Sequence, residues 1–414
     1  MKLNLNNFYI FEIMDRTFII DLKYKFFFSV KSSYFTEDKL INPESVLNKA
    51  ILKKREIYSM LLNKSVNSVY LLVTDKCNLT CKFCCMRANE TKEEYNKLNY
   101  VTIKKRVIPI LKQLNPRKII ISGGEPLTNG ELISILRLIR EESSSMINLQ
   151  TNGTLVTSSF LEVISDVINN IEVSTAHFSN YNNLYPITRK CNSLGIGLTL
   201  SYTYQNDINS LFRIIDFVVN NNVSFVLNFI TKSGSALDNN IEILKSKNKI
   251  DIFKKVAKYL IEKDYCNNKI AELFFSSIPV RQSCNALGKM LSVYPDGNLY
   301  LCHSLNIPEF SVGNIFGEPL EIIENWKELI SREYVKNLFE VDRDKKCVDC
   351  KYKYLCGGFC GELVYNQSVT PDACLIQKFF ILYKLIVYDH KITNKENLRN
   401  FIEFSEQLDK VELF

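Results

Sequence analysis

Histidine is scarce in this chain, and long apolar runs are absent from it. The 414 residues include only three histidines, His177, His303 and His390, which leaves little material for zinc sites that combine cysteine with histidine. No apolar run reaches the ~18 residues that a membrane-spanning helix needs. The chain also does not open with a basic stretch and an apolar signal core. We therefore expect a cytoplasmic protein with no membrane partner.

Charge of one sign is not concentrated anywhere in the sequence. The 52 basic and 45 acidic residues give a net charge of +7 and are spread along the chain. No block of lysine and arginine forms the stripe that is typical of nucleic-acid binding. A well-solvated surface explains this charge, so we expect no nucleic-acid partner.

Cysteine, in contrast, is abundant. With 414 residues, 46% of them hydrophobic, the chain can bury a substantial core and is long enough for two or three domains. It contains thirteen cysteines. Because cytoplasmic thiols stay reduced, so many cysteines indicate metal ligands rather than disulfides.

Three of these cysteines lie on one short loop. Cys77, Cys81 and Cys84 have the spacing C-x3-C-x2-C and directly follow the apolar run 69–73, which predicts a buried strand. Proteins with parallel strands place their chemistry on the loops at the C-terminal ends of those strands. Thiolates ligate iron–sulfur clusters, and three of them on a four-iron cluster leave one iron open to a small molecule. The alternative is a zinc site, although zinc favours C-x2-C pairs completed by cysteine or histidine.

The loop resembles the signature of the radical S-adenosylmethionine (SAM) superfamily, with Phe83 at the aromatic position before the third cysteine. The resemblance implies that Cys77, Cys81 and Cys84 hold a [4Fe–4S] cluster whose open iron binds SAM, with Phe83 beside the bound cofactor. It also implies an electron donor, such as a flavodoxin or ferredoxin, and cleavage of SAM to a 5′-deoxyadenosyl radical.

The chain beyond this loop alternates between β-prone and helix-periodic stretches. Such alternation predicts parallel strands joined by crossover helices. Six strands are too few for a complete eight-stranded barrel. They suit the partial (β/α)6 barrel that the resemblance implies, so the expected fold class is α/β. The predicted strands are 69–74, 118–122, 147–150, 171–175, 197–203 and 225–229, and the predicted helices are 103–114, 132–141, 160–168, 184–194, 211–219 and 252–261.

The second predicted strand leads into Gly123, Gly124 and Glu125. Paired glycines let the backbone approach a ligand closely, and a carboxylate can accept hydrogen bonds from an ammonium group. Taken alone, this segment is an ordinary turn. It is similar to the G-G-E motif of the superfamily, which implies that Gly123, Gly124 and Glu125 hold the amino group of the methionine moiety of SAM.

Two further strand ends resemble segments that contact SAM in the superfamily. Thr151 and Asn152 follow the third strand, where relatives often carry Thr-Asn-Gly. Ser174 ends the fourth strand, where many relatives carry Ser-x-Asp-Gly and the serine reaches the carboxylate or ribose of SAM. Ala176 and His177 replace the Asp-Gly here, so His177 lies near the site, where a loop histidine without a catalytic role is the simpler interpretation.

Seven more cysteines follow in the last third of the chain. Their spacing, with a predicted hairpin at 294–297 between the first two, resembles the SPASM domain of radical SAM peptide-modifying enzymes. The resemblance implies two auxiliary [4Fe–4S] clusters, hence three clusters in all. A zinc ribbon at the C-x2-C pair is the alternative. By position, the first auxiliary cluster would be held by Cys284, Cys302 and Cys360, and the second by Cys347, Cys350, Cys356 and Cys374.

Some SPASM domains add an eighth cysteine shortly before the first of the seven. In this chain Ile278 lies in that region, and the nearest upstream cysteine is Cys266. Apolar residues between Cys266 and Cys284 predict ordered structure that holds Cys266 away. We therefore expect the fourth position of the first auxiliary cluster to be open or filled by another group.

Three β-prone runs, 8–13, 16–22 and 24–30, precede a predicted helix that begins at Asn42 and Pro43. This pattern resembles the leader-peptide recognition modules of peptide-modifying enzymes, and a β-rich extension that only buttresses the barrel is the alternative. The predicted units are an N-terminal β/α unit at 1–66, the partial barrel at 67–265, the SPASM domain at 266–378 and C-terminal helices at 379–414.

These resemblances imply a radical SAM enzyme that modifies a ribosomally made precursor peptide, with a thioether or carbon–carbon crosslink as the favoured product. One alternative is an anaerobic sulfatase maturase, which oxidises a cysteine or serine of a protein client to formylglycine. A second alternative is a non-catalytic iron–sulfur electron carrier, which the Gly123–Glu125 motif argues against.

Overall fold

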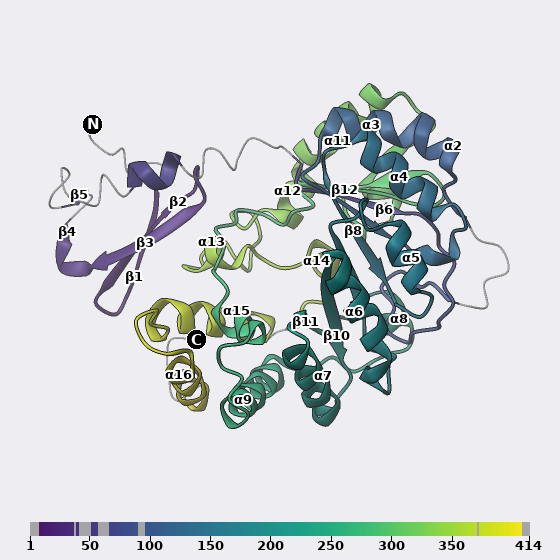
Figure 1. Cartoon of the computed structure of the whole chain (residues 1–414). Helices are drawn as coiled ribbons and strands as arrows, with labels where there is room; N and C mark the ends of the chain where they lie inside the picture. Colours follow the sequence, from purple (N-terminus) through teal and green to yellow (C-terminus); the bar gives the residue numbers. More distant parts are fainter. Residues whose placement is uncertain are drawn as a thin grey trace.

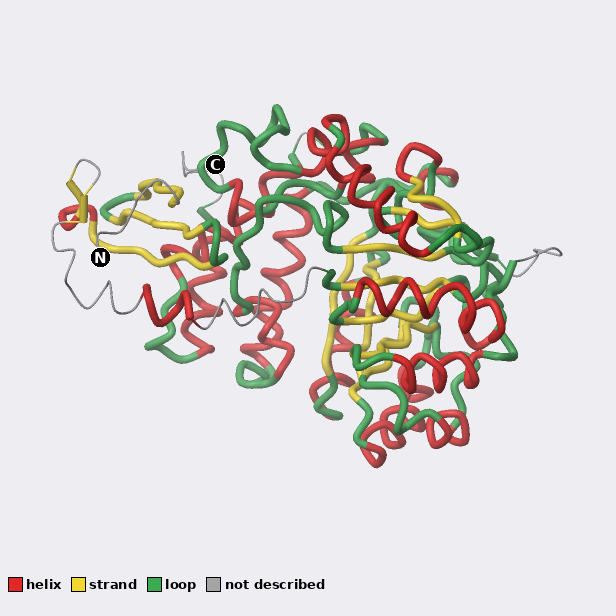
Figure 2. The backbone as a smooth tube through the Cα atoms, turned by 90° about the horizontal axis from the view of Figure 1, so that it is seen from above, coloured by secondary structure: helices red, strands yellow, loops and turns green. Residues whose placement is uncertain are grey.

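The computed structural model describes residues 8–36, 39–40, 51–56, 66–89, 96–370 and 372–407. It contains a three-stranded antiparallel sheet and a nine-stranded mixed sheet. Figures 1 and 2 show the small sheet at one side of the molecule and the large sheet at the other. No helix of the described part has both the length and the apolar character required for a bilayer crossing.

The small sheet confirms the three predicted N-terminal strands. Its order is β1-β2-β3, so β1 and β3 are its edges among the described strands. Phe18, Ile19 and Ile20 of the central strand are almost fully buried. The predicted helix start at Asn42 and Pro43 lies outside the described residues, whereas residues 51–56 are helical. The strands are β1 (Phe8–Ile13), β2 (Arg16–Asp21) and β3 (Phe26–Lys31), followed by the short pair β4 (Phe35–Thr36) and β5 (Lys39–Leu40).

The alternation predicted for the barrel is confirmed. Six parallel strands occur in chain order, each close to its predicted bounds. The predicted helix 160–168 is too long, because Ile164 leaves the helical region at φ −108° and ψ 5°. The strands are β6 (Ser68–Leu72), β7 (Lys118–Ser122), β8 (Met146–Thr151), β9 (Asn170–Ser174), β10 (Gly197–Tyr204) and β11 (Ser224–Phe229), and the main helices are α2 (Tyr100–Thr102), the π-helical η3 (Ile103–Val107), α3 (Ile108–Leu114), α4 (Leu132–Glu142), α5 (Ser158–Val163), α6 (Tyr185–Leu194), α7 (Ile208–Asn220), α8 (Gly234–Asp238) and α9 (Ser246–Glu262).

Side-chain alternation along these strands separates a core face from an interior face. Val69 and Leu71 of β6 are fully buried, as are Ile119 and Ile121 of β7. These residues pack with the helices in one continuous hydrophobic core. The intervening positions on the barrel interior are more polar, as in Gln150 of β8, which donates to Glu172 of β9 at 3.3 Å. The interior can therefore accept a polar ligand.

The C-terminal third extends the same sheet instead of forming a separate one. Strand β12 pairs in parallel with β6, with Leu291 opposite Val69 and Val293 opposite Leu71. The sheet order is β11-β10-β9-β8-β7-β6-β12-β13-β14. The sequence predicted the hairpin at 294–297 but not this continuity. The strands are β12 (Met290–Val293), β13 (Asn298–Tyr300) and β14 (Ser311–Asn314), and the helices are α10 (Glu272–Phe275), α11 (Pro319–Ser331), α12 (Glu333–Phe339), α13 (Lys353–Cys356), α14 (Gly361–Tyr365), α15 (Ala373–Leu382), the π-helical η8 (Tyr383–Val387) and α16 (Asn394–Glu406).

The N-terminal sheet contacts the loop around α13 directly. The ring of Tyr9 packs edge-on against Tyr354 with centroids 4.7 Å apart, and Phe11 meets Tyr352 at 6.0 Å. Lys25 also donates to the side chain of Gln282. The sheet is thus anchored to the segment that carries the last cysteines.

Candidate metal centres and cofactor site

The loop after β6 brings Cys77, Cys81 and Cys84 together. The amide of Cys84 donates to the carbonyl of Cys81 at 3.1 Å, which folds the loop into a tight turn. Burial raises the pKa of the Cys77 thiol, and the charges of Cys84 and Cys81 raise it further. Burial and the charge of Cys84 likewise raise the pKa of Cys81. The three thiols therefore share one space at the C-terminal end of β6. Phe83 lies half-buried on the same turn.

The turn after β7 lies directly against this loop. The amide of Gly124 donates to the carbonyl of Thr74, and that of Glu125 donates to the carbonyl of Lys76, both at 2.8 Å. A Cβ atom on Gly123 would lie 2.3 Å from the Thr74 oxygen, and one on Gly124 would lie 2.2 Å from the Lys76 oxygen. Only glycine permits this close backbone approach, and Gly123 also has a φ of +145°.

The Glu125 carboxylate is engaged by the protein itself. It has no exposed surface, and it accepts from the Leu127 amide at 3.1 Å, the Thr151 hydroxyl at 2.8 Å and the Asn152 amide at 2.7 Å. Burial raises its pKa, and these hydrogen bonds oppose the shift. These hydrogen bonds tie the end of β8 to the glycine turn, and the expected contact of Glu125 with SAM stays a prediction.

The residues after β8 reach back to the cysteine loop. The side chain of Asn152 donates to the side chain of Asn78 at 2.8 Å and lies 4.0 Å from the sulfur of Cys77. Thr151 is buried and donates to Glu125. Ser174 ends β9 in register with Ser201 of β10, on the interior face. The structure thus groups Asn152 with the thiols and places Thr151 in a supporting position behind them.

His177 lies on the loop after β9, as expected. Its Nε2 atom is buried without a hydrogen-bond partner among the described residues. Burial lowers its pKa, and its ring packs against Phe178 with centroids 4.2 Å apart. These observations describe a neutral imidazole that packs within the loop.

Cys284, Cys302 and Cys360 come together from three separate segments. The charges of Cys284 and Cys360 both act on Cys302, whose pKa burial raises to about 12. Cys284 is fixed by its amide, which donates to the carbonyl of Phe339 at 3.0 Å. Beside them the Nδ1 atom of His303 lies 3.9 Å from the sulfur of Cys302. The His303 ring stacks on Tyr70 of β6 at 4.1 Å, so this set adjoins the barrel interior.

The other four cysteines form a second set around α13. The amide of Cys350 donates to the carbonyl of Cys347 at 2.9 Å. The charges of Cys356 and Cys374 act on Cys347, and those of Cys374 and Cys350 act on Cys356. Gly357 adopts a φ of +80° directly after α13, which turns the chain at the end of the helix. The four thiols thus share one space, although the chain between them has little regular structure.

The donor chemistry of all three sets fits iron–sulfur clusters better than single ions. No three cysteine, histidine or acidic side chains of the described residues converge on one point as a single metal ion requires. A zinc ion needs its thiolates at about 2.3 Å from one centre. Each thiolate of an iron–sulfur cluster binds a different iron, so its ligands share a space while remaining further apart. Cysteine thiols make up each of the three sets, and thiolates are the ligands of such clusters.

Cys266 is remote from these sets. Its thiol is buried and contacts the carbonyl of Leu260 in α9 at 3.5 Å. Its pKa is raised first by burial, and the nearby charges that act on it are those of Lys395, Asp264 and Arg399. Its backbone carbonyl accepts from Asn394 at the start of α16. Cys266 therefore packs between α9 and α16.

Sequence reasoning missed Glu362, two residues after Cys360. Burial raises its pKa to about 7, and the charge of Arg87 opposes the shift. Its charge in turn acts on Cys85 and Tyr294, so α14 brings a carboxylate close to the first cysteine loop. Spacing along the chain carries no signal for this contact, because it depends on how α14 packs across the mouth of the barrel.

Comparison with known proteins identifies two domains. Residues 71–195 match the radical SAM superfamily, and residues 284–351 match SPASM, an iron–sulfur cluster-binding domain. The chain has a radical SAM domain followed by a SPASM domain. The radical SAM cyclopropyl synthase TigE of Paramaledivibacter caminithermalis is 24% identical over 397 residues, which cover 81% of this chain and 76% of TigE. A GTP 3′,8-cyclase of Desulforamulus reducens is 31% identical over 106 residues, covering 25% of this chain and only 31% of the cyclase.

Solved structures support the same fold. SuiB of Streptococcus suis, bound to its precursor peptide SuiA, aligns with a TM-score of 0.54 at 13% identity, covering 89% of this chain and 97% of SuiB. The protein anSMEcpe, bound to SAM and the Cp18Cys peptide, aligns with a TM-score of 0.55 at 16% identity, covering 83% of this chain and 97% of anSMEcpe. The expected architecture, a partial barrel followed by a SPASM domain, is therefore confirmed.

Proposed function

We propose that this radical SAM protein is a peptide maturase, which cleaves SAM and uses the resulting radical to crosslink a ribosomally made peptide through a thioether or carbon–carbon bond. The observation that supports the proposal is the backbone contact between the three-thiol loop and the Gly123–Gly124 turn, because the proposed SAM-binding turn then lies against the proposed cluster ligands. A peptide substrate is supported by the similarity to the cyclopropyl synthase TigE and by the fold shared with SuiB, which was solved with its precursor peptide SuiA.

In this proposal, Cys77, Cys81 and Cys84 hold a [4Fe–4S] cluster. When bound, that cluster supplies the electron that cleaves SAM into methionine and a 5′-deoxyadenosyl radical, which abstracts a hydrogen atom from the peptide. The protein positions the reactants. The backbone of Gly123 and Gly124 offers close contact to the methionine end of SAM, and Phe83, Asn152 and Ser174 line the remaining strand ends. The hydrogen bond from Thr151 to Glu125 stabilises this arrangement.

The two SPASM cysteine sets would hold auxiliary clusters, for a total of three. The set of Cys284, Cys302 and Cys360 adjoins the barrel through His303 and Tyr70, so it is the better placed of the two to receive the electron left on the oxidised peptide or to bind a substrate thiolate. The N-terminal sheet is the proposed leader-binding unit, because an extended peptide can add a strand to a free sheet edge.

The direct test is to incubate the anaerobically reconstituted protein with SAM, a reductant and a peptide encoded beside its gene. A maturase yields 5′-deoxyadenosine together with a peptide that has lost hydrogen atoms and carries a crosslink in its fragmentation spectrum. Unchanged peptide alongside rapid SAM cleavage would contradict the choice of substrate. No SAM cleavage at all would favour the electron-carrier alternative.

Sulfatase maturation is the second candidate, because anSMEcpe aligns as well as SuiB does. The N-terminal sheet separates the two candidates experimentally. Deleting residues 1–66 should weaken binding of a leader-bearing peptide while sparing SAM cleavage without peptide. If the deleted protein instead converts a cysteine-containing sulfatase peptide to formylglycine at the full rate, the sulfatase alternative replaces the proposal.

A further inference from the structure

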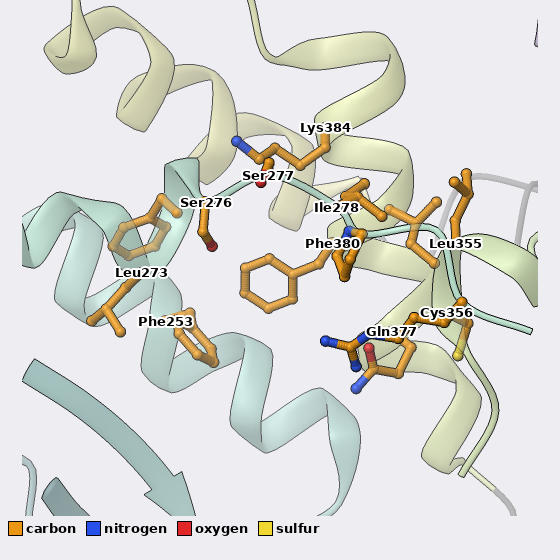
Figure 3. Close-up of a pocket in the computed structure, with 14 residues that line it drawn as sticks. Phe253, Leu273, Ser276, Ser277, Ile278, Leu355, Cys356, Gln377, Phe380 and Lys384 are labelled. Atoms are coloured by element: carbon orange, nitrogen blue, oxygen red, sulfur yellow. The ribbon is translucent and has the colours of Figure 1, made fainter. Parts of the chain in front are cut away.

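The first cysteine loop and the second cysteine set differ in what lies against them. A pocket of about 310 Å³ reaches the second set, and Figure 3 shows the rings of Phe253 and Phe380 and the thiol of Cys356 among its lining side chains. The first loop is instead in close contact with protein backbone on two sides. One side is the Gly123–Gly124 turn. The other is the segment of residues 234–239, which contains α8 and follows β11 (Figure 1).

This α8 segment holds the main chain of the loop at the third cysteine. The amide of Ser235 donates to the carbonyl of Cys84 at 2.8 Å. The side chain of Asn239 donates to the carbonyl of Lys82 at 3.0 Å. Because both acceptors are backbone carbonyls of the loop, the two hydrogen bonds fix its main chain at Cys84 and just before it.

Gly234 brings the two segments closer than a residue with a side chain would permit. A Cβ atom at this position would lie 2.4 Å from the oxygen of Cys84 and 2.6 Å from both the Cα atom and the oxygen of Cys85. Gly234 also has a φ of +51°, a conformation that costs little only for glycine. A side chain at this position would therefore displace the main chain at Cys84 and Cys85 or move α8 away from it.

An ion pair joins the same two segments. The Nε and Nη2 atoms of Arg87 donate to the two carboxylate oxygens of Asp238 at 2.7 Å and 3.2 Å. Both side chains are about half exposed, so the pair adds little free energy, but its two parallel hydrogen bonds restrict geometry. The charge of Arg87 also acts on Glu362 of α14. The ion pair therefore orients the end of the loop against α8.

These contacts connect opposite ends of the partial barrel. The loop follows β6, the α8 segment follows β11, and β7, β8, β9 and β10 lie between those strands in the sheet. The first half of the loop is hydrogen-bonded to the turn after β7. The position of Cys84 relative to that turn is thus restrained from both sides. Such restraint matters for a reaction, because a misplacement of about 1 Å can lower a rate about a hundredfold.

We propose that Gly234 and the rest of the α8 segment are positioning residues for SAM cleavage, which set the backbone of the third cluster ligand against the SAM-binding turn. The inference rests on the proposed function, because it takes Cys77, Cys81 and Cys84 to hold the SAM-cleaving cluster. The segment adds no chemical step. It acts through the loop, by hydrogen bonds, an ion pair and close packing.

The test compares Gly234→Ala with Gly195→Ala in the full-length protein with its clusters reconstituted. Gly195 is the matched control, because its φ is +69° and no described residue lies within 4 Å of its added Cβ. Both variants carry the strain of a side chain at positive φ, whereas only Gly234→Ala also displaces the cysteine loop. Both should retain the wild-type iron content, and their melting temperatures should agree within about 5 °C.

Two measurements without peptide report the position of the loop. Titration of the reduced protein with SAM, followed by electron paramagnetic resonance, gives the dissociation constant of SAM, and release of 5′-deoxyadenosine gives the turnover rate. For Gly234→Ala we expect the dissociation constant to rise about tenfold and the turnover rate at saturating SAM to fall about tenfold to a hundredfold. The spectral change that SAM induces should also differ from that of wild type. Gly195→Ala should match wild type in all of these.

Asn239→Asp is a milder variant that adds no atom to the contact. An aspartate cannot donate to the Lys82 carbonyl, so the turnover rate should fall about threefold. Asn221→Asp is its matched control. Both asparagines follow the last residue of a helix and donate to the carbonyl four residues earlier, at 2.8 Å in each case, but Asn221 ends α7 and makes no bond to the loop. Its turnover rate should stay within about 1.5-fold of wild type.

Equal SAM affinities and turnover rates in Gly234→Ala and Gly195→Ala would overturn the proposal. It would also be overturned if Gly234→Ala lost iron or stability while the turnover rate per intact cluster stayed at the wild-type value, since the segment would then only stabilise the fold. If Gly234→Ala does not fold, equal turnover rates in Asn239→Asp and Asn221→Asp overturn it. Failure of the proposed function looks different: the peptide would stay unmodified, while these variants would still alter SAM cleavage.

Discussion

The first cysteine loop and the second SPASM set are built in opposite ways. Cys77, Cys81 and Cys84 lie on one loop whose ends are fixed by β6 and by backbone hydrogen bonds to the turn after β7. The second set joins Cys347 to Cys374 across short helices and turns, of which α13 has only four residues. In the first case the fold positions the ligands. In the second case the ligands lie where little else orders the chain.

This difference predicts different consequences of metal loss. A loop supported by parallel strands retains its scaffold without metal, so removal of its ligands should affect chemistry alone. Where thiols substitute for regular structure, metal binding contributes to the folding free energy. The N-terminal sheet depends on this second region as well, because Tyr9 and Phe11 pack on Tyr354 and Tyr352 between two of its cysteines.

The largest expected effect is on chemistry, in the triple variant Cys77→Ala, Cys81→Ala and Cys84→Ala. Formation of 5′-deoxyadenosine should fall below detection, because no ligand for the SAM-cleaving cluster remains. The melting temperature should change by no more than about 3 °C, and iron should persist on the SPASM domain. Chromatographic assay of 5′-deoxyadenosine, with iron analysis, checks both statements. Undiminished SAM cleavage in this variant would refute the assignment.

The second effect should be on stability. Cys350→Ala or Cys356→Ala should lower the melting temperature by roughly 5–10 °C, because the region around α13 loses a metal ligand that orders it. Differential scanning calorimetry under anaerobic conditions measures the shift. Chelator treatment of wild type should reproduce it. If the melting temperature changes no more than in the triple variant, the two regions are not built differently.

The sequence predicted the first region better than the second. Strand bounds around the first loop were nearly correct, because buried parallel strands read as continuous apolar runs. The Gly-Gly-Glu turn was also found, through its similarity to the superfamily motif, and the structure shows that its glycines also permit a close approach to the backbone of Thr74 and Lys76. The hydrogen bonds from Thr151 and Asn152 to the Glu125 carboxylate were not predicted, because only the fold reveals them.

The predictions for the SPASM region were correct for the hairpin and incomplete for its surroundings. The pairing of β12 with β6 joins strands that are far apart in sequence. The sequence of neither strand indicates which strand it pairs with. The approach of Glu362 to Arg87 and Cys85 depends on the packing of α14. Such contacts between distant segments arise from tertiary packing, which periodicity and spacing do not encode.

A smaller effect is expected at the contact between the cysteine loop and the glycine turn. Gly124→Ala places a Cβ atom 2.2 Å from the Lys76 carbonyl, so the loop must shift. We expect SAM affinity to fall about tenfold to a hundredfold, since this shift costs roughly 1.4–2.8 kcal/mol of binding free energy. Gly130→Ala is the control, because nothing lies within 4 Å of its added Cβ. Equal SAM affinities in equilibrium dialysis would show that the close approach is dispensable.

The smallest effect is expected for Cys266. It tests whether a cysteine outside the two compared regions binds metal. Its thiol contacts the Leu260 carbonyl between α9 and α16, and the charges that act on it belong to those neighbouring segments. Cys266→Ala should therefore retain the wild-type iron content and lose only about 1 kcal/mol of unfolding free energy, as for a small buried side chain. We also expect the auxiliary signal in electron paramagnetic resonance to shift when a cysteine-containing peptide is added, if the cluster proposed for Cys284, Cys302 and Cys360 has an open fourth position. Loss of one cluster's iron in Cys266→Ala would instead make Cys266 a ligand after a rearrangement of α9 and α16, and the first auxiliary cluster would then be closed to substrate.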